Sequence, residues 1–257
     1  MHIRFAKYQG TGNDFVIIDN RFNPVQLSTE QIHHLCDRRF GIGADGLMLL
    51  QEKPGYDFEM KYYNADGNEG SMCGNGGRCM VQFAHDRGIH RTDYFFLAVD
   101  GPHEAKIAMN GWVHLKMKDV DAVEQANEDA VLDTGSPHYI RKTTNLQSLN
   151  VFEEGRKIRY NDRFAEKGIN VNFIEPIDNG IFVRTYERGV EDETYSCGTG
   201  VTAAALTVAK QIGNNRIDII TLGGKLAVEY TKAGEQAFHS IWLCGPATFV
   251  FEGQIEI

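Results

Sequence analysis

Two cysteines in this sequence stand in the same local setting, and each could act as an acid or a base. Cys73 lies in "NADGNEGSMCGNGGRC" and Cys197 in "YERGVEDETYSCGTGVTAAA", and both patterns predict a cysteine where a glycine-rich loop becomes a helix. There the helix dipole and the unpaired first-turn amides can lower a thiol pKa from about 8.5 to roughly 3.5–7.5. Such a thiol can accept a proton near neutral pH, and the neighbouring amides can hold a carboxylate.

Two such thiols suit the inversion of a carbon next to a carboxylate. One thiolate removes the proton from one face, one thiol returns a proton to the other, and N–H donors stabilise the charge that builds on the carboxylate. The alternative interpretation is that Cys73 and Cys197 are small core residues, and the duplicated glycine-flanked setting disfavours it. We expect Cys36, Cys79 and Cys244, which lie in apolar segments, to be core residues.

The landmarks of the first half of the chain recur in order in the second half. The matching pairs lie 123 to 127 residues apart: "TGNDFVI" and "TGSPHYI", "GIGADGLM" and "GINVNFI", "MCGNG" and "SCGTG", "VDGPHEA" and "LGGKLAV". A period above about 100 residues predicts two similar domains rather than a solenoid. We expect a pseudo-twofold pair with the active site in the cleft between them, and a seam in the polar stretch Lys118–Ala130.

The elements that must position the cysteines follow from the apolar pattern. Helices are predicted from the capping box of Ser28 and Gln31 to Gly41, from Cys73 to near Gly88, and from Cys197 to near Gly213. The last is apolar or small almost all round, which predicts a helix enclosed by sheet. Strands are predicted at Ile3–Tyr8, Phe15–Asp19, Leu47–Gln51, Phe58–Asn64, Ala105–Met109, Val113–Met117, Phe182–Glu187, Ile217–Leu222, Leu226–Tyr230, Ser240–Leu243 and Phe249–Ile257.

Composition narrows the possible partners. A net charge of -9 over 257 residues argues against a nucleic-acid or anionic-membrane surface. No signal-like N-terminus and no stretch of about 18 apolar residues is present, so we expect a cytoplasmic protein. Five cysteines without a C-x-x-C pair suggest reduced thiols, with neither a disulfide framework nor a metal site. The expected partners are a small-molecule substrate and a second copy of the chain in a homodimer.

Along essentially its full length the chain resembles the diaminopimelate epimerase family of cofactor-independent amino-acid epimerases. The segments that carry the resemblance are "YQGTGNDFVIIDN", "GIGADG", "YNADGNEGSMCGNGGRC", "GINVNF" and "YERGVEDETYSCGTG". The resemblance implies an α/β fold of two pseudo-symmetric halves, each a curved, mostly antiparallel sheet around a central helix. It places the halves at 1–118 and 119–246, with the final strand, 247–257, returning to the first. It also implies that no cofactor is needed.

The resemblance implies a role for each matching residue. Cys73 and Cys197 would be the acid/base pair that interconverts LL- and meso-diaminopimelate, in lysine and peptidoglycan precursor synthesis. The remaining roles are these: backbone amides of Gly74, Asn75, Gly198 and Thr199 on the reacting carboxylate; Asn13 and Glu187 beside the reacting centre; Asn64, Asn170 and Arg188 on the distal amino-acid end; and His138 near a catalytic thiol. From the residues alone, loop capping would explain Asn64 and Asn170, and a solvated charge would explain Arg188.

Two positions depart from the family pattern, and four other interpretations remain open. Ser136 stands where the family commonly has an asparagine, and Gly46 stands where some members have a glutamine. A proline or hydroxyproline racemase would have a histidine after the Cys-Gly, where this chain has Asn75. An isomerase of the phenazine-biosynthesis type would lack the cysteine pair, and a non-catalytic amino-acid-binding protein would show a lost cysteine or broken loop. A pyridoxal-phosphate racemase would need a Schiff-base lysine, and none stands out.

Overall fold

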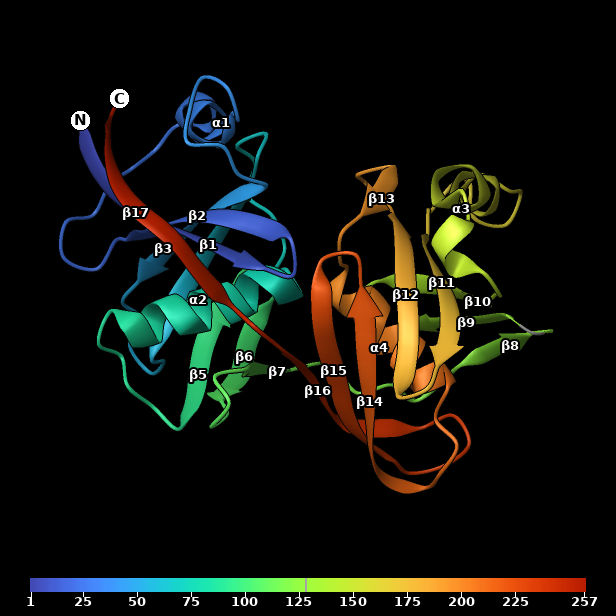
Figure 1. Cartoon of the computed structure of the whole chain (residues 1–257). Helices are drawn as coiled ribbons and strands as arrows, with labels where there is room; N and C mark the ends of the chain where they lie inside the picture. Colours follow the sequence, from blue (N-terminus) through green and yellow to red (C-terminus); the bar gives the residue numbers. More distant parts are fainter. Residues whose placement is uncertain (128) are drawn as a thin grey trace. The chain divides into compact units, whose positions relative to one another are not determined.

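The computed structural model describes residues 1–127 and 129–257, and it divides into two compact units (Figure 1). Unit 1 comprises Met1–Leu115 and Gly245–Ile257, and unit 2 comprises Lys116–Cys244. The chain therefore leaves unit 1 once and returns to it for its last strand. Residue 128, in the stretch 118–130 where the sequence predicts a seam, lies outside the described residues.

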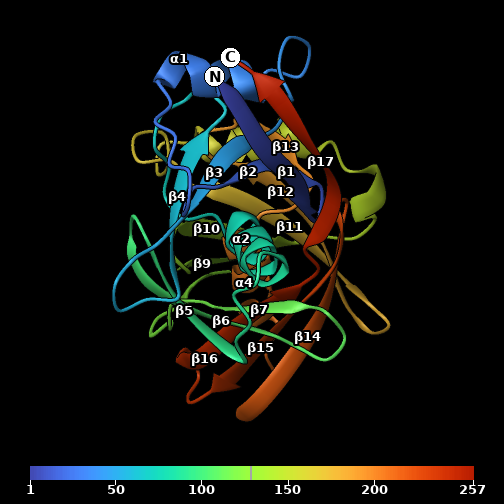
Figure 2. The same ribbon diagram turned by 90° about the vertical axis from the view of Figure 1, so that its left-hand side faces the viewer.

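Unit 1 is a sheet that surrounds a helix. Its elements are β1 (His2–Gly10), β2 (Asn13–Asp19), α1 (Thr29–Cys36), β3 (Gly46–Gln51), β4 (Phe58–Asn64), α2 (Gly74–Asp86), β5 (Asp93–Ala98), β6 (Gly101–Ile107), β7 (Val113–Lys116) and β17 (Thr248–Glu256). Helix α2 contacts β1, β2, β3, β4, β6 and β17. Figure 2 looks almost along α2, with these strands arranged around it.

Unit 2 repeats this plan. Its elements are β8 (Glu124–Ala126), β9 (Asp129–Asp133), β10 (Pro137–Lys142), a 3-10 turn (Leu146–Ser148), α3 (Val151–Arg159), β11 (Asn170–Ile177), β12 (Gly180–Glu187), β13 (Asp192–Thr194), α4 (Gly198–Thr207), β14 (Gly213–Thr221), β15 (Gly224–Lys232) and β16 (Phe238–Gly245). Helix α4 contacts β9, β10, β11, β12, β14 and β15, and most of its residues are buried. The predicted enclosed helix is confirmed.

Strand pairing matches between the units step by step. In unit 1, β1–β2 is antiparallel, β2–β3 parallel, β3–β4 antiparallel, β4–β5 parallel and β5–β6 antiparallel. In unit 2, β9–β10, β10–β11, β11–β12, β12–β14 and β14–β15 show the same alternation. In both, the long strand that leads toward the central helix (β4, or β12 followed by the short β13) pairs parallel with the strand after the helix. The two-halves α/β architecture predicted for the chain is confirmed.

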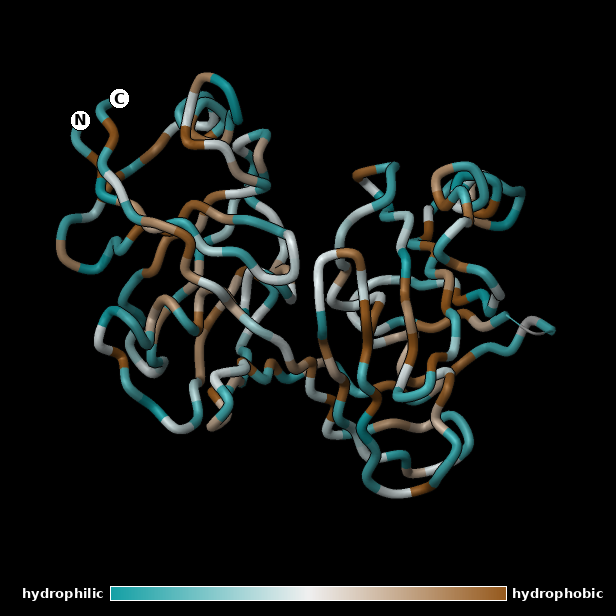
Figure 3. Tube along the Cα trace, in the orientation of Figure 1, coloured by the Kyte–Doolittle hydropathy of each residue, from teal (hydrophilic) through white to brown (hydrophobic). Residues whose placement is uncertain are grey.

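Apolar residues concentrate along the strands, while the turns at their ends are mostly hydrophilic (Figure 3). One core cluster packs α1 on β1–β3 through residues such as Ile32, Leu35 and Leu47. The equivalent cluster packs α3 on β10–β12 through residues such as Val151, Ile158 and Tyr186. Among the described residues, no helix is both long and apolar enough to span a membrane.

Two sequence-based predictions of helix ends need correction. Helix α1 ends at Cys36 rather than Gly41, because Asp37 is extended and its carboxylate caps the amides of Arg39 and Phe40 in a turn. Helix α4 ends at Thr207 rather than near Gly213, where β14 already begins.

Helix α3 was not predicted at all. Its apolar face is short, and Gly155 interrupts it because a Cβ there would lie 2.4 Å from Cβ of Tyr186 on β12. Strands β5, β8, β9, β10, β11 and β13 also went unpredicted.

Candidate active-site halves around Cys73 and Cys197

Cys73 and Cys197 both occupy the residue that starts a central helix. Cys73 is the N-cap of α2 with φ -97° and ψ 131°, and Cys197 is the N-cap of α4 with φ -112° and ψ 115°. Their carbonyls accept the first helical hydrogen bonds, from Gly77 at 2.7 Å and Val201 at 2.9 Å. First-turn amides have no carbonyl partner within their own helix, so both cysteines border a set of N–H donors. The predicted cysteine at each helix start is confirmed.

The two thiols differ in exposure from each other and in setting from the remaining cysteines. Cys73 is half-buried, whereas Cys197 is buried with 8% of its surface exposed. Cys36, Cys79 and Cys244 are core residues, as predicted. Burial raises the pKa of Cys36 to about 11 and that of Cys79 to about 12, which keeps both protonated.

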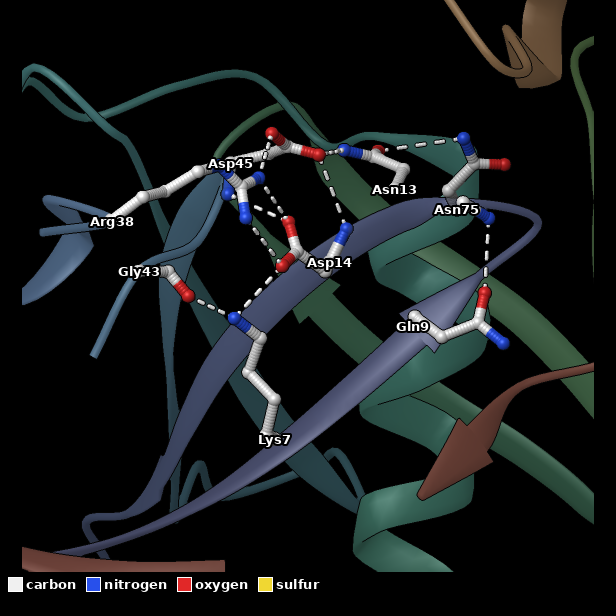
Figure 4. Close-up of polar contacts among 9 residues, drawn as sticks. Lys7, Gln9, Asn13, Asp14, Arg38, Gly43, Asp45 and Asn75 are labelled. Carbon is white, nitrogen blue, oxygen red and sulfur yellow. Dashed lines mark hydrogen bonds and ion pairs between the residues drawn. The ribbon is translucent and has the colours of Figure 1, made fainter. Parts of the chain in front are cut away.

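In unit 1, an asparagine faces the Cys73 thiol with its carbonyl oxygen. The Cys73 Sγ lies 3.5 Å from Asn13 Oδ1, to which Asn75 Nδ2 also donates at 3.4 Å. The other side of the Asn13 amide donates to Asp45 Oδ2 at 2.6 Å (Figure 4). A carboxylate only accepts hydrogen bonds, so the Asn13 nitrogen must face Asp45 and its oxygen must face the thiol.

A charged cluster holds Asp45 and the start of β2 in place (Figure 4). Arg38 donates to both oxygens of Asp14, at 3.0 and 2.7 Å, and to Asp45 at 2.7 Å. Lys7, which is buried, forms an ion pair with Asp14 at 2.8 Å and donates to the Gly43 carbonyl. Burial alone would raise the pKa of Asp14, but hydrogen bonds from Arg38 and Lys7 hold it well below its usual range. The Asp14 carboxylate is therefore ionised throughout the neutral range.

A fully buried arginine, Arg78, forms hydrogen bonds with the first turn of α2. Arg78 donates to Thr11 Oγ1 at 3.2 Å, to Asn75 Oδ1 at 3.1 Å and to the Gly74 carbonyl at 3.3 Å. Because a guanidinium only donates, the Asn75 oxygen must face Arg78 and its amide nitrogen must face Asn13. Arg78 thus orients the Asn75 side chain beside the Cys73 thiol.

In unit 2, a hydroxyl lies between the thiol and a buried histidine. Thr199 Oγ1 is 3.5 Å from Cys197 Sγ and 2.9 Å from His138 Nε2. Ser136 Oγ joins the same group, 3.0 Å from His138 Nε2 and 3.2 Å from Thr199 Oγ1. Burial, with a smaller contribution from the Arg188 charge, lowers the pKa of His138 to about 3. The imidazole is therefore neutral near pH 7.

Residues expected at the distal end of a substrate gather next to this group. Asn170 Nδ2 donates to Ser136 Oγ at 3.1 Å and to the Pro137 carbonyl at 3.0 Å, while its Oδ1 accepts from the Arg188 amide at 2.9 Å. Ser136 thus receives an amide hydrogen bond at the position where the family commonly has asparagine. The Arg188 guanidinium donates to the Lys167 carbonyl at 3.2 Å.

Two other predicted site residues lie at strand ends. Glu187 ends β12 and accepts from Thr194 Oγ1 at 2.8 Å. Asn64 ends β4, and its backbone closes its own loop through Asn68 and Gly67. The assignment of Asn64 to substrate stays a prediction.

Glycines near the two cysteines, and Gly46 on β3, lie against neighbouring side chains. A Cβ at Gly200 would lie 2.4 Å from Asn172 Oδ1, whereas a Cβ at Gly76 would meet Met48 Sδ at 3.3 Å. At Gly46, where some family members have a glutamine, a Cβ would lie 2.6 Å from the Tyr62 ring. A tyrosine therefore fills the space beside β3 that a longer side chain would need.

Sequence reasoning missed the residues that stand behind the site. Asp45 lies within "GIGADG" and Asn172 within "GINVNF", segments that were already recognised as distinctive. Asp45 contacts the Asn13 amide and Asn172 contacts the His138 ring across more than 30 residues of sequence, so no spacing along the chain signals them. The recurrence of these two segments in the two halves of the sequence was the one available signal.

Comparisons with solved structures show the fold. A phenazine biosynthesis protein of the PhzF family from Bacillus anthracis matches with a TM-score of 0.76 at 16% identity, over 100% of both chains. A hydroxyproline epimerase from Agrobacterium vitis matches with a TM-score of 0.68 at 14% identity, over 99% of this chain and 92% of its own. The chain thus shares the fold of these two proteins.

Sequence comparisons define the family. The diaminopimelate epimerase family matches residues 5–122 and again residues 130–250, one match in each half. A diaminopimelate epimerase from Flavobacterium psychrophilum is 48% identical over 98% of this chain and 100% of its own length. One from Chlorobaculum tepidum is 41% identical over 96% and 99%. The chain belongs to the diaminopimelate epimerase family and is an isomerase, which confirms the resemblance described above.

Proposed function

We propose that this protein inverts one α-carbon of diaminopimelate, interconverting the LL and meso forms, as a step in lysine and peptidoglycan precursor synthesis. The observation that carries the proposal is the pair of cysteines, Cys73 and Cys197, each at the start of a central helix. Membership of the family supports the choice of substrate.

In the proposed mechanism, the reacting α-carbon comes within reach of both thiols. A thiolate removes the α-proton, which becomes its S–H, while the electron pair spreads onto the substrate carboxylate. The first-turn amides of Gly74, Asn75, Gly198 and Thr199 hold that carboxylate and stabilise its growing charge. The second cysteine then delivers its thiol proton to the opposite face and becomes the thiolate. One proton is lost and one gained, so no cofactor takes part in the balance.

Neighbouring residues would bind the rest of the substrate. Asn13 accepts a hydrogen bond beside the reacting centre, and the Glu187 carboxylate pairs with the α-ammonium group. Asn64, Asn170 and Arg188 bind the distal amino-acid end, where a guanidinium matches a carboxylate. The hydrogen bond between the Arg188 amide and Asn170 supports their acting together.

The test is proton NMR of LL-diaminopimelate in heavy water with catalytic amounts of reduced protein and no added cofactor. We expect the α-proton signal to disappear as meso product grows. Cys73→Ala and Cys197→Ala should abolish both changes, whereas Cys36→Ala, at a buried cysteine on α1, should retain them. If the wild-type protein leaves the α-proton intact, the substrate is wrong, and proline and hydroxyproline are the next compounds to try.

We also propose that the protein is cytoplasmic, because its chemistry needs reduced thiols. We further propose that it forms a homodimer through β17. Three consecutive large apolar residues of β17, Phe249, Val250 and Phe251, are exposed. Exposed apolar runs on a strand commonly mark an interface. Val250→Asp should convert a dimer to a monomer in sedimentation equilibrium, while Ile177→Asp, at an exposed position of β11, should not. A wild-type monomer would refute this.

A further inference from the structure

The backbone carbonyl of Tyr139 determines which atoms near Cys197 donate hydrogen bonds and which accept them. Asn172 Nδ2 lies 3.3 Å from the Tyr139 carbonyl and 3.1 Å from His138 Nδ1, while its Oδ1 accepts from Thr185 Oγ1 at 2.9 Å. A carbonyl oxygen only accepts, so the Asn172 atom that faces it must be the amide nitrogen. That nitrogen also faces His138 Nδ1, which must then accept and carries no proton.

The tautomer of His138 follows from this contact. A neutral imidazole with an accepting Nδ1 has its proton on Nε2. The fully buried ring is neutral because desolvation disfavours its charged form and lowers its pKa. The Nε2–H group points at Thr199 Oγ1, 2.9 Å away, and at Ser136 Oγ, 3.0 Å away.

The Thr199 hydroxyl is thereby directed at the thiol. Ser136 Oγ accepts from Asn170 Nδ2, which leaves its own hydrogen for Thr199 Oγ1 at 3.2 Å. Thr199 Oγ1 then accepts from His138 and Ser136, so its hydrogen points to Cys197 Sγ, 3.5 Å away. A hydroxyl donor favours a thiolate over a thiol.

We propose that Asn172 is a positioning residue that sets the His138 tautomer and so directs the Thr199 hydroxyl at the Cys197 sulfur. Cys73, in contrast, lies next to a hydrogen-bond acceptor, because the Asn13 oxygen can only accept from its S–H. The free enzyme therefore holds Cys197 as thiolate and Cys73 as thiol. This last assignment rests on the proposed function: Cys197 takes the first α-proton, Cys73 donates its own, and exchange with solvent restores the starting state.

Gly200 gives independent evidence that Asn172 lies against the helix that carries Cys197. It is the second glycine of "SCGTG", and a Cβ there would lie 2.4 Å from Asn172 Oδ1. The helix that carries Cys197 thus approaches β11 closely at Asn172. At the matching position of unit 1, the Cβ of Gly76 would meet only the flexible Met48 side chain and the Phe15 ring, at 3.3 and 3.5 Å.

The first test is nitrogen NMR of the free enzyme labelled with 15N-histidine, with His138→Gln to assign the signals. We expect the wild-type His138 to carry its proton on Nε2 and none on Nδ1 at neutral pH. In Asn172→Asp, the carboxylate should draw a proton onto Nδ1, while Asn179→Asp, at an exposed asparagine in the same hairpin, should leave the tautomer unchanged. A proton on Nδ1 in the wild type, or an unchanged tautomer in Asn172→Asp, overturns the proposal.

The second test measures the thiolate directly and needs no substrate. Iodoacetamide labelling of the free enzyme, resolved by mass spectrometry, reports Cys73 and Cys197 in one sample. Thr199→Val should slow labelling of Cys197 by about tenfold, the loss of one hydrogen bond to a charged group. Thr199→Ser, which keeps the hydroxyl, should restore it, and Cys73 labelling should not change. Equal Cys197 rates in the three proteins would overturn the relay even if diaminopimelate is turned over.

Discussion

The buried, neutral His138 predicts a specific loss of stability in mild acid. Its pKa is about 3 in the folded protein against an ordinary value of 6.5, so between these values the unfolded chain binds a proton that the folded chain does not. Its contribution to stability is fully present above pH 6.5 and is lost as the pH falls toward 3. Between pH 8 and pH 5 the loss is about 2 kcal/mol, and it reaches about 4 kcal/mol near pH 3.

The assay is urea unfolding of the wild type and of His138→Gln at both pH values. The variant lowers stability at either pH, but it removes the histidine term, so its stability should fall by about 2 kcal/mol less than that of the wild type between pH 8 and pH 5. His34→Gln, at an exposed histidine of α1, should retain the wild-type difference. Equal pH dependence in the wild type and His138→Gln would refute a neutral buried imidazole.

Two further predictions concern residues near the thiols. Gly200→Ala should lower unfolding free energy by about 1–3 kcal/mol and reduce epimerase activity, since its Cβ would collide with Asn172, whereas Gly76→Ala at the equivalent position should be milder; equal melting temperatures would contradict this. Asp45→Asn should lower kcat/KM about tenfold without unfolding the protein, because a neutral amide no longer fixes the direction of Asn13; wild-type kinetics would show that Asn13 is held by other groups.

The internal repeat of the sequence predicted more of the fold than the apolar pattern of the individual segments did. The apolar pattern did not predict helix α3, because Gly155 interrupts the apolar face of the helix. However, α3 lies where the repeat requires a counterpart of α1. Strands β10 and β11 escaped for a similar reason: polar residues such as His138 and Asn172 point inward there and are satisfied by one another. Alternation of apolar and polar residues cannot reveal a strand whose inner face is partly polar.

The two helix-start cysteines, the enclosure of α4 and the twofold architecture could all be predicted from the amino-acid sequence. Each of these depends on residues that are close in the chain or on a pattern that recurs along it. The directions in which the side chains around each thiol donate hydrogen bonds could be read only from the folded chain. Asp45 contacts Asn13 from the loop before β3, and Asn172 contacts His138 from β11, although each pair is more than 30 residues apart in the chain. In each series of hydrogen bonds, the directions follow from a group that can only accept, the Asp45 carboxylate or the Tyr139 carbonyl. Such a group comes next to its partner only when the chain folds.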